Sequence, residues 1–112
     1  MDDFAERRKL PRISVSWPVT VYTSAGELTG ETKNLTPSGA SIQCKERLNL
    51  NETCWLQIRV PRHDLMLMGK VVWSDLVIEK TGADVSHAGL SFIHIEGEDR
   101  QILRDAIMET EH

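Results

Sequence analysis

The sequence predicts an all-β domain with one C-terminal helix, folded as a six-stranded antiparallel β-barrel. Six short stretches have strand character, with apolar side chains at alternate residues, and short connections join them. The end of the chain instead repeats apolar residues at helical spacing. Its 112 residues are enough for a single core, and six short strands would leave exposed edges unless the sheet closes.

The first three strands are expected between residues 13 and 44. Apolar and polar residues alternate from Ile13 to Tyr22, and Pro18, which has no backbone N–H, predicts a kink or a sheet edge. Residues 23–26 are typical of a hairpin turn, and a second strand is expected over 28–34. A cluster of turn-forming residues, 34–39, separates it from a short strand over 40–44.

The other strands and the helix follow a polar loop at 45–52. The fourth strand spans 53–60 and ends before Pro61. The fifth runs from Leu65 through Trp73 with a bulge or bend at Gly69, and the sixth is expected over 88–95 after a polar loop. Apolar residues at helical spacing then predict a helix over 98–110 that packs on the barrel.

Composition and charge exclude several classes of function. The longest mostly apolar stretch contains Lys70 and Asp75, so no membrane-spanning helix and no membrane insertion are expected. The N-terminus does not fit a signal peptide, so a cytoplasmic protein is expected, with Cys44 and Cys54 as buried thiols. The formal net charge of -4 argues against a protein that coats DNA or RNA.

No catalytic or metal-binding motif stands out. The histidines are not at zinc-site spacing with either cysteine, and Ser86 and His87 lack the surroundings of a catalytic triad. The Gly-rich loops of nucleotide triphosphate enzymes are missing from the sequence. We therefore expect no enzyme activity, no metal and no cofactor.

A short basic run near the N-terminus suits an anionic ligand. Arg7, Arg8 and Arg12 lie within six residues, and Pro11 favours an extended arm that displays them. A guanidinium group can hold a phosphate or the N7/O6 edge of guanine through its planar fork. The plainer interpretation is a solvated, charged arm.

A second polar segment lies where two predicted strands meet. Asn34 and Thr36 have equal strand parity, so an amide and a hydroxyl face the same side and can bond base edges. Gly39 permits a close approach or a positive φ. Taken alone, this segment is more typical of a capped turn.

Together the two segments resemble the signature of the PilZ domain family, Arg-x-x-x-Arg in an N-terminal arm and Asp/Asn-x-Ser-x-x-Gly on a barrel. Arg8 and Arg12 match the first motif, and Asn34, Thr36 and Gly39 match the second, with Thr in place of the usual Ser. Segments 69–73 and 89–93 are similar to later strands of the family. The resemblance implies a PilZ-like split barrel over residues 13–112, behind a flexible arm formed by residues 1–12.

The resemblance also implies a bacterial receptor for the second messenger cyclic di-GMP. Arg8 and Arg12 would grip guanine and phosphate from the arm, while Asn34 and Thr36 would bond a guanine and Gly39 would leave room for it. Binding is expected to order the arm, and the ordered arm is expected to signal to a protein effector that the sequence does not identify.

Three further expectations concern stoichiometry, alternatives and the tryptophans. Arg7 precedes the first motif arginine, and in some family members such an arginine goes with an intercalated pair of ligands, which implies two ligands per domain. Two alternatives stay open: a PilZ-like barrel without nucleotide that acts as a protein–protein interaction module, and a small barrel that binds RNA or DNA. Trp17, Trp55 and Trp73 are expected to pack in the core or at its rim.

Overall fold

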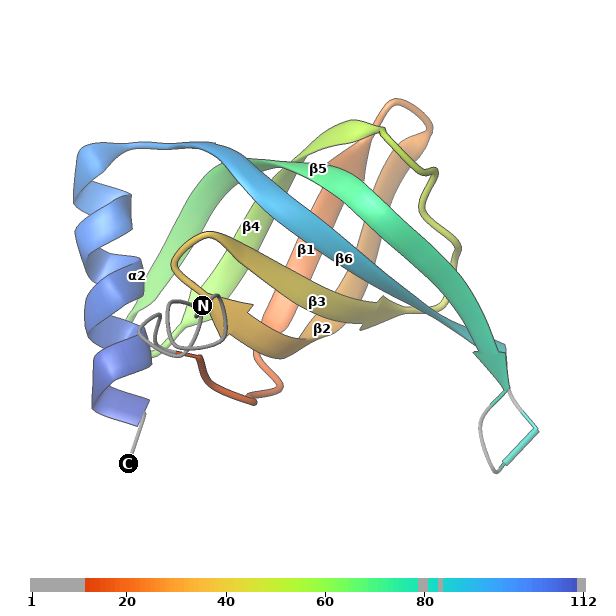
Figure 1. Cartoon of the computed structure of the whole chain (residues 1–112), viewed down its shortest axis with the longest axis horizontal. Helices are drawn as coiled ribbons and strands as arrows, with labels where there is room; N and C mark the ends of the chain where they lie inside the picture. Colours follow the sequence, from red (N-terminus) through yellow and green to blue (C-terminus); the bar gives the residue numbers. More distant parts are fainter. Residues whose placement is uncertain (1–11, 79–80, 83, 111–112) are drawn as a thin grey trace, which may run out of the picture.

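The computed structural model describes residues 12–78, 81–82 and 84–110. The strands are β1 (Pro18–Thr23), β2 (Gly26–Thr36), β3 (Gly39–Cys44), β4 (Thr53–Val60), β5 (His63–Ile78) and β6 (Asp84–Ile95), followed by helix α2 (Gly97–Thr110). All strand pairs are antiparallel and close into a barrel in the order β1-β2-β3-β6-β5-β4 (Figure 1). The predicted antiparallel barrel with one C-terminal helix is confirmed.

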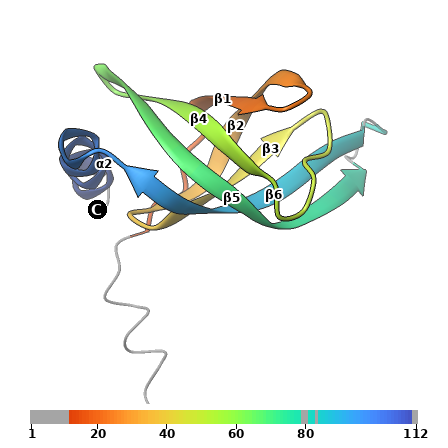
Figure 2. The same cartoon turned by 90° about the horizontal axis from the view of Figure 1, so that it is seen from above.

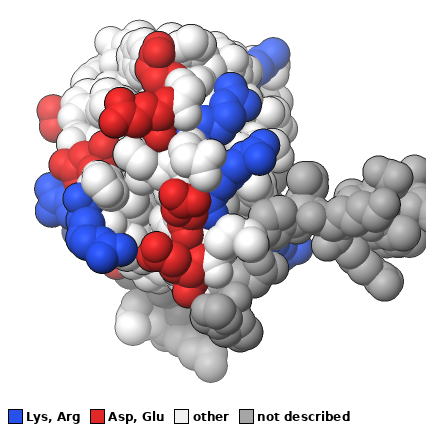
Figure 3. All heavy atoms as spheres, turned by 90° about the vertical axis from the view of Figure 1, so that its left-hand side faces the viewer, with Lys and Arg blue, Asp and Glu red and all other residues white. Residues whose placement is uncertain are grey.

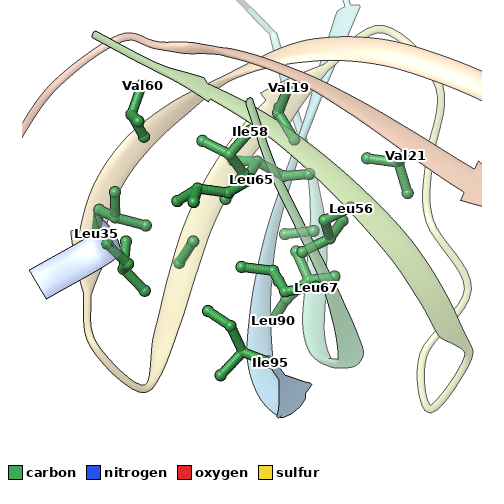
Figure 4. Close-up of a cluster of buried hydrophobic side chains, with 14 of the residues drawn as sticks. Val19, Val21, Leu35, Leu56, Ile58, Val60, Leu65, Leu67, Leu90 and Ile95 are labelled. Carbon is green, nitrogen blue, oxygen red and sulfur yellow. The ribbon is translucent and has the colours of Figure 1, made fainter. Parts of the chain in front are cut away.

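The barrel interior is filled by alternate side chains of each strand. In β4 the buried residues are Cys54, Leu56, Ile58 and Val60. This is the two-residue period that predicted the strand, and neighbouring strands point side chains such as Leu65 and Leu90 into the same core (Figure 4). Each fully buried side chain of this kind stabilises the fold by about 1.5–3 kcal/mol.

Helix α2 covers the end of the barrel at which β5 begins (Figures 1 and 2). It contributes three buried residues to the core, namely Leu103, Ala106 and Ile107. The Asp99 carboxylate accepts a hydrogen bond from the Met66 N–H at 3.4 Å, and Asp99 lies in the first turn, where a carboxylate complements the helix dipole. Acidic and basic side chains are interspersed over this side of the described chain (Figure 3).

Strand β1 begins at Pro18, not at Ile13 as predicted. The reason is Thr32 of β2, whose Oγ1 accepts a hydrogen bond from the Trp17 N–H at 2.9 Å and donates one to the Val15 carbonyl. The Thr32 side chain thus replaces part of the backbone ladder ahead of the strand, where the Thr32 N–H still donates to the Trp17 carbonyl at 2.9 Å. Pro18 is the first residue of β1. It pairs with Glu31 of β2, whereas pairing with β4 begins at Val19, so one side of Pro18 is unpaired as predicted for an edge position.

Strands β5 and β6 are longer than predicted. β5 starts at His63 instead of Leu65 and continues to Ile78, and β6 starts at Asp84 instead of Ala88. The additional residues pair with each other over 74–78 and 84–88. They form a ribbon, the β5–β6 ribbon, whose tip extends past the other strands (Figures 1 and 2), while β3 still pairs with β6 at residues 86–88.

Several smaller predictions are confirmed. The turn at 23–26 and the loop at 45–52 lie between the expected strands, and a register shift between Met68 and Gly69 marks the expected bulge. The turn predicted over 34–39 is shorter, because β2 continues to Thr36. Cys44 and Cys54 are free, buried thiols, and burial raises the pKa of Cys54 to about 11. In the described ranges, no helix is long and apolar enough to cross a membrane.

Candidate functional site

Two β-bulges turn polar and aromatic side chains onto the outer face of the barrel. In β2 the register shifts at Lys33, so that Thr32 is fully buried while Asn34, two residues later, is only half-buried. In β5 the register shifts between Val71, which is fully buried, and Trp73, which is 43% exposed. Without the bulges, the two-residue period would direct Asn34 and Trp73 into the core.

The residues that the bulges turn outward lie in one row across the sheet. Asn34 of β2 pairs with Ser41 of β3, Ser41 pairs with Gly89 of β6, and Gly89 pairs with Trp73 of β5. Three strand spacings give this row a length of about 14 Å. An open groove of about 330 Å³ follows the row, and its lining also includes Arg12, Thr36, Gly39, Ala40, Val72 and Leu90.

The groove brings together four of the predicted site residues, namely Arg12, Asn34, Thr36 and Gly39. Arg7 and Arg8 lie outside the described residues. A pair of backbone hydrogen bonds positions Arg12, because its neighbour Ile13 exchanges bonds of 3.0 and 2.9 Å with Leu35 of β2. This bridge ties the segment ahead of β1 to β2 and holds Arg12 at the groove.

The Asn34 side chain is oriented by two neighbours. Its Oδ1 accepts a hydrogen bond from Ser14 Oγ at 2.9 Å, and its Nδ2 donates one to Ser41 Oγ at 3.2 Å. A primary amide has two N–H donors and two acceptor lone pairs. Within the described residues, one donor and one acceptor of Asn34 are therefore left for a ligand.

Thr36 and Gly39 have structural roles in the turn between β2 and β3. The Thr36 hydroxyl accepts hydrogen bonds from the Ser38 and Gly39 N–H groups, at 3.2 and 3.1 Å. A Cβ at position 39 would lie 2.6 Å from the Leu90 carbonyl oxygen of β6, so only glycine fits. The contacts of Thr36 and Gly39 with guanine stay predictions.

Trp73 is the groove residue whose place the sequence did not reveal. Its indole lies against Gly89, where a Cβ would be 2.1 Å from Trp73 Nε1, so the ring packs directly on the β6 backbone. Trp73 therefore packs, as expected, but it also lines the groove with 43% of its surface exposed. An exposed indole beside an amide and a guanidinium suits a flat aromatic ligand that carries negative charge. Gly89 lies opposite Trp73 through the strand pairing, so no local sequence signal indicates the exposed ring.

A second open cleft, of about 580 Å³, lies between Trp17 and the β4–β5 hairpin. Its cations already have partners, because Arg59 Nε is 3.4 Å from Asp64 and Arg62 Nη2 is 3.5 Å from Glu109. It is therefore a weaker anion site than the groove. In the part of the chain that the structure describes, no group of three His, Cys, Asp or Glu residues could hold a metal ion.

Comparison with known families agrees with the fold. A family model described as "PilZ domain" matches residues 6–109. The chain belongs to the PilZ domain family. PilZ domains are receptor and regulatory domains. No curated protein is similar enough to the chain to count as a match.

Solved PilZ structures have the same architecture. The PilZ domain of YcgR from Escherichia coli with c-di-GMP has a TM-score of 0.74 and 12% identity, over 94% of this chain and 92% of that chain. The K. pneumonia MrkH–c-di-GMP complex has a TM-score of 0.74 and 11% identity, over 92% and 52%. The Bacillus subtilis inhibitor of motility has a TM-score of 0.72 and 17% identity, over 92% and 50%. The chain thus spans about half the length of the last two proteins, and at these identities the likeness shows the fold.

Proposed function

We propose that this PilZ domain is a cytoplasmic bacterial receptor for cyclic di-GMP, without enzyme activity of its own. The observation that carries the proposal is the convergence of Arg12, Asn34 and Trp73 on one groove. The YcgR and MrkH structures with c-di-GMP bound support this choice of ligand.

Each groove residue offers a contact that matches one part of the ligand. A guanine can stack on the exposed face of the Trp73 indole, and the free donor and acceptor of Asn34 can bond a purine edge. Arg12 can pair with a phosphate or with the N7/O6 edge of guanine. Stacking contributes about 1–3 kcal/mol per base, and a charge-assisted hydrogen bond about 1.5–3 kcal/mol. A few such contacts supply the roughly 8 kcal/mol of micromolar binding.

The N-terminal arm completes the proposed site. Arg8 joins Arg12 in gripping the ligand, and Arg7 favours a second ligand molecule stacked on the first. Ordering of residues 1–12 over the groove is the change that an effector protein recognises. The arm thus couples occupancy of the groove to the surface that a partner meets.

Calorimetric titration of cyclic di-GMP into the wild type and the Arg8→Ala/Arg12→Ala variant tests the proposal. We expect micromolar or tighter binding by the wild type, and binding at least about tenfold weaker in the variant, since at least one charge-assisted bond is lost. Arg104→Ala is the matched control, because it removes an exposed arginine from α2, outside the groove. Two ligands per wild-type domain and one in Arg7→Ala would support the role of Arg7.

The competing functions give different results in the same titration. Folded wild-type protein that shows no binding would contradict the receptor and favour the nucleotide-free interaction module. Equal affinity in the wild type and the double variant would contradict the role of the arginines. Salt-dependent binding to oligonucleotides in place of cyclic di-GMP would favour a nucleic-acid-binding barrel.

A further inference from the structure

The second half of β5 has an open edge. β5 pairs with β4 over 63–70 and with β6 over 67–78. At Val71, the backbone N–H donates a hydrogen bond to the Glu52 carbonyl of the preceding loop at 2.9 Å. Beyond Val71, no described strand pairs with the side of β5 that faces away from β6. The Ser74 carbonyl faces this side, since it accepts a hydrogen bond from Arg47 Nη2 at 3.4 Å. By the two-residue period, the backbone N–H and C=O groups of Leu76 and Ile78 face the same way.

This open edge is apolar. The side chains of Leu76 and Ile78 are 53% and 72% exposed. Over residues 74–78 the sequence has one charged residue, Asp75, and no lysine or proline. Natural proteins protect sheet edges with lysine, proline or a covering segment, because unpaired backbone groups beside apolar side chains attract another strand.

A groove runs beside the edge. It has a volume of about 610 Å³ and lies between the loop residues 47–50 and the β5 residues 72–75. Leu50, on the loop wall, is 59% exposed. An extended chain placed in this groove would therefore have the β5 backbone on one side and Leu50 on the other, after it displaces the Arg47 guanidinium from the Ser74 carbonyl.

Charge favours one of the two kinds of chain that could add a strand to this edge, a second copy of this protein or a segment of another protein. If two copies paired their open edges antiparallel around a two-fold axis at Ser74 or Leu76, the Asp75 side chains of the two copies would be diagonal cross-strand neighbours. Each copy also has a formal net charge of -4. Both effects are repulsive. A strand with a basic side chain beside Asp75 gains attraction at the same position.

We propose that the open edge of β5, residues 74–78, is a docking site for an extended segment of a partner protein. That segment adds a strand to the sheet, with apolar side chains at alternate positions and a basic side chain next to Asp75. Backbone hydrogen bonds would supply affinity, and the side-chain pattern would supply specificity. The proposal does not depend on nucleotide binding.

Two synthetic peptides test the proposal on the full chain. The first is Thr-Val-Thr-Val-Lys-Val-Thr-Val-Thr, and the second has Glu in place of Lys. We expect the Lys peptide to shift the backbone amide resonances of Leu76 and Ile78 in NMR spectra and to slow their hydrogen exchange. The Glu peptide is expected to bind about fivefold more weakly, from the energy of one cross-strand charge pair. Asp75→Lys should reverse this preference.

A backbone variant tests the mode of binding. Leu76→Pro removes an N–H from the open edge without removing a β5–β6 hydrogen bond, so it should abolish peptide binding while resonances elsewhere stay unchanged. Leu76→Val keeps the donor and serves as the matched control. Equal binding of both peptides, no shift at millimolar peptide, or shifts confined to another strand would overturn the proposal. A dimer of the free protein that Leu76→Pro dissociates would overturn it as well, in favour of a second copy.

Discussion

The two halves of β5 have similar apolar residues and opposite surroundings. In the first half, Leu67 is paired on both sides and Leu65 is paired with β4 at the end that α2 covers (Figure 1), and both are fully buried. In the second half, paired on one side beyond Val71, Leu76 and Ile78 are exposed. Barrel closure and the cover of α2, and not strand propensity, therefore determine which residues form the core. The candidate groove lies where the two halves meet, at the bulge that precedes Trp73.

The sharpest test of this comparison is one substitution in each half. Leu67→Ala should lower the free energy of unfolding by about 2–5 kcal/mol, because it leaves a cavity in a closed core. Leu76→Ala should change it by less than about 0.5 kcal/mol, as exposed positions do. Denaturant unfolding measures both, and equal effects would mean that the ribbon is part of the core.

Glycine substitutions extend the test to the turn beside the groove. Gly39→Ala should destabilise the protein by about 1–3 kcal/mol, because its Cβ would meet the Leu90 carbonyl oxygen at 2.6 Å. Gly97→Ala is the control, since no neighbouring atom lies within 4 Å of a Cβ there. Thermal unfolding separates the two, and a wild-type melting temperature for Gly39→Ala would contradict the tight packing of β3 on β6.

The Thr36 hydroxyl gives a smaller effect in the same turn. Thr36→Val keeps the shape but removes the acceptor of the Ser38 and Gly39 N–H groups, and should cost about 1 kcal/mol of unfolding free energy per lost bond. Thr36→Ser keeps the hydroxyl and should retain most of the stability. If both variants unfold like the wild type, the turn does not depend on these bonds.

Much of the barrel follows from its sequence, and the exceptions have physical causes. β4 matches its predicted bounds because its alternation is unbroken. The ribbon was missed because the bulge before Trp73 reverses which residues face inward, and polar Ser74 and Asp75 follow it. A glycine indicates the bulge at Gly69, whereas the bulge before Trp73 and the unpaired edge of β5 leave no such mark in the local residue pattern.

The sequence likewise predicts some residues of the candidate site, whereas others depend on tertiary contacts. The two motifs predict Arg12 and Asn34 as binding residues, and the structure places both at one groove, while their contacts with a ligand stay predictions. Trp73 was assigned to packing because its exposed face depends on Gly89, a neighbour that only the strand pairing reveals. The reason for glycine at position 39, its closeness to Leu90, is likewise a tertiary contact that no local pattern contains.

A further prediction concerns the pH dependence of stability in the closed part of the barrel. Burial raises the pKa of Cys54 to about 11, above the value near 9 of a free thiol. The folded state thus holds a proton that the unfolded state releases, so this contribution to stability is complete below about pH 9 and is lost as the pH rises towards 11. Denaturant unfolding between pH 8 and about 10.5 measures it. The free energy of unfolding of Cys54→Ala should fall less between pH 8 and about 10.5 than that of the wild type.

The most direct test of the nucleotide site uses the three tryptophans as internal probes. In two-dimensional NMR spectra, titration with cyclic di-GMP should shift the indole N–H resonance of Trp73, which lines the groove, more than those of Trp17 and Trp55, which do not. Single Trp→Phe variants assign the three resonances. A larger shift at Trp73, together with shifts at the Asn34 side-chain amide, is the expected result. Saturable binding that leaves Trp73 and Asn34 unchanged would contradict the groove as the site.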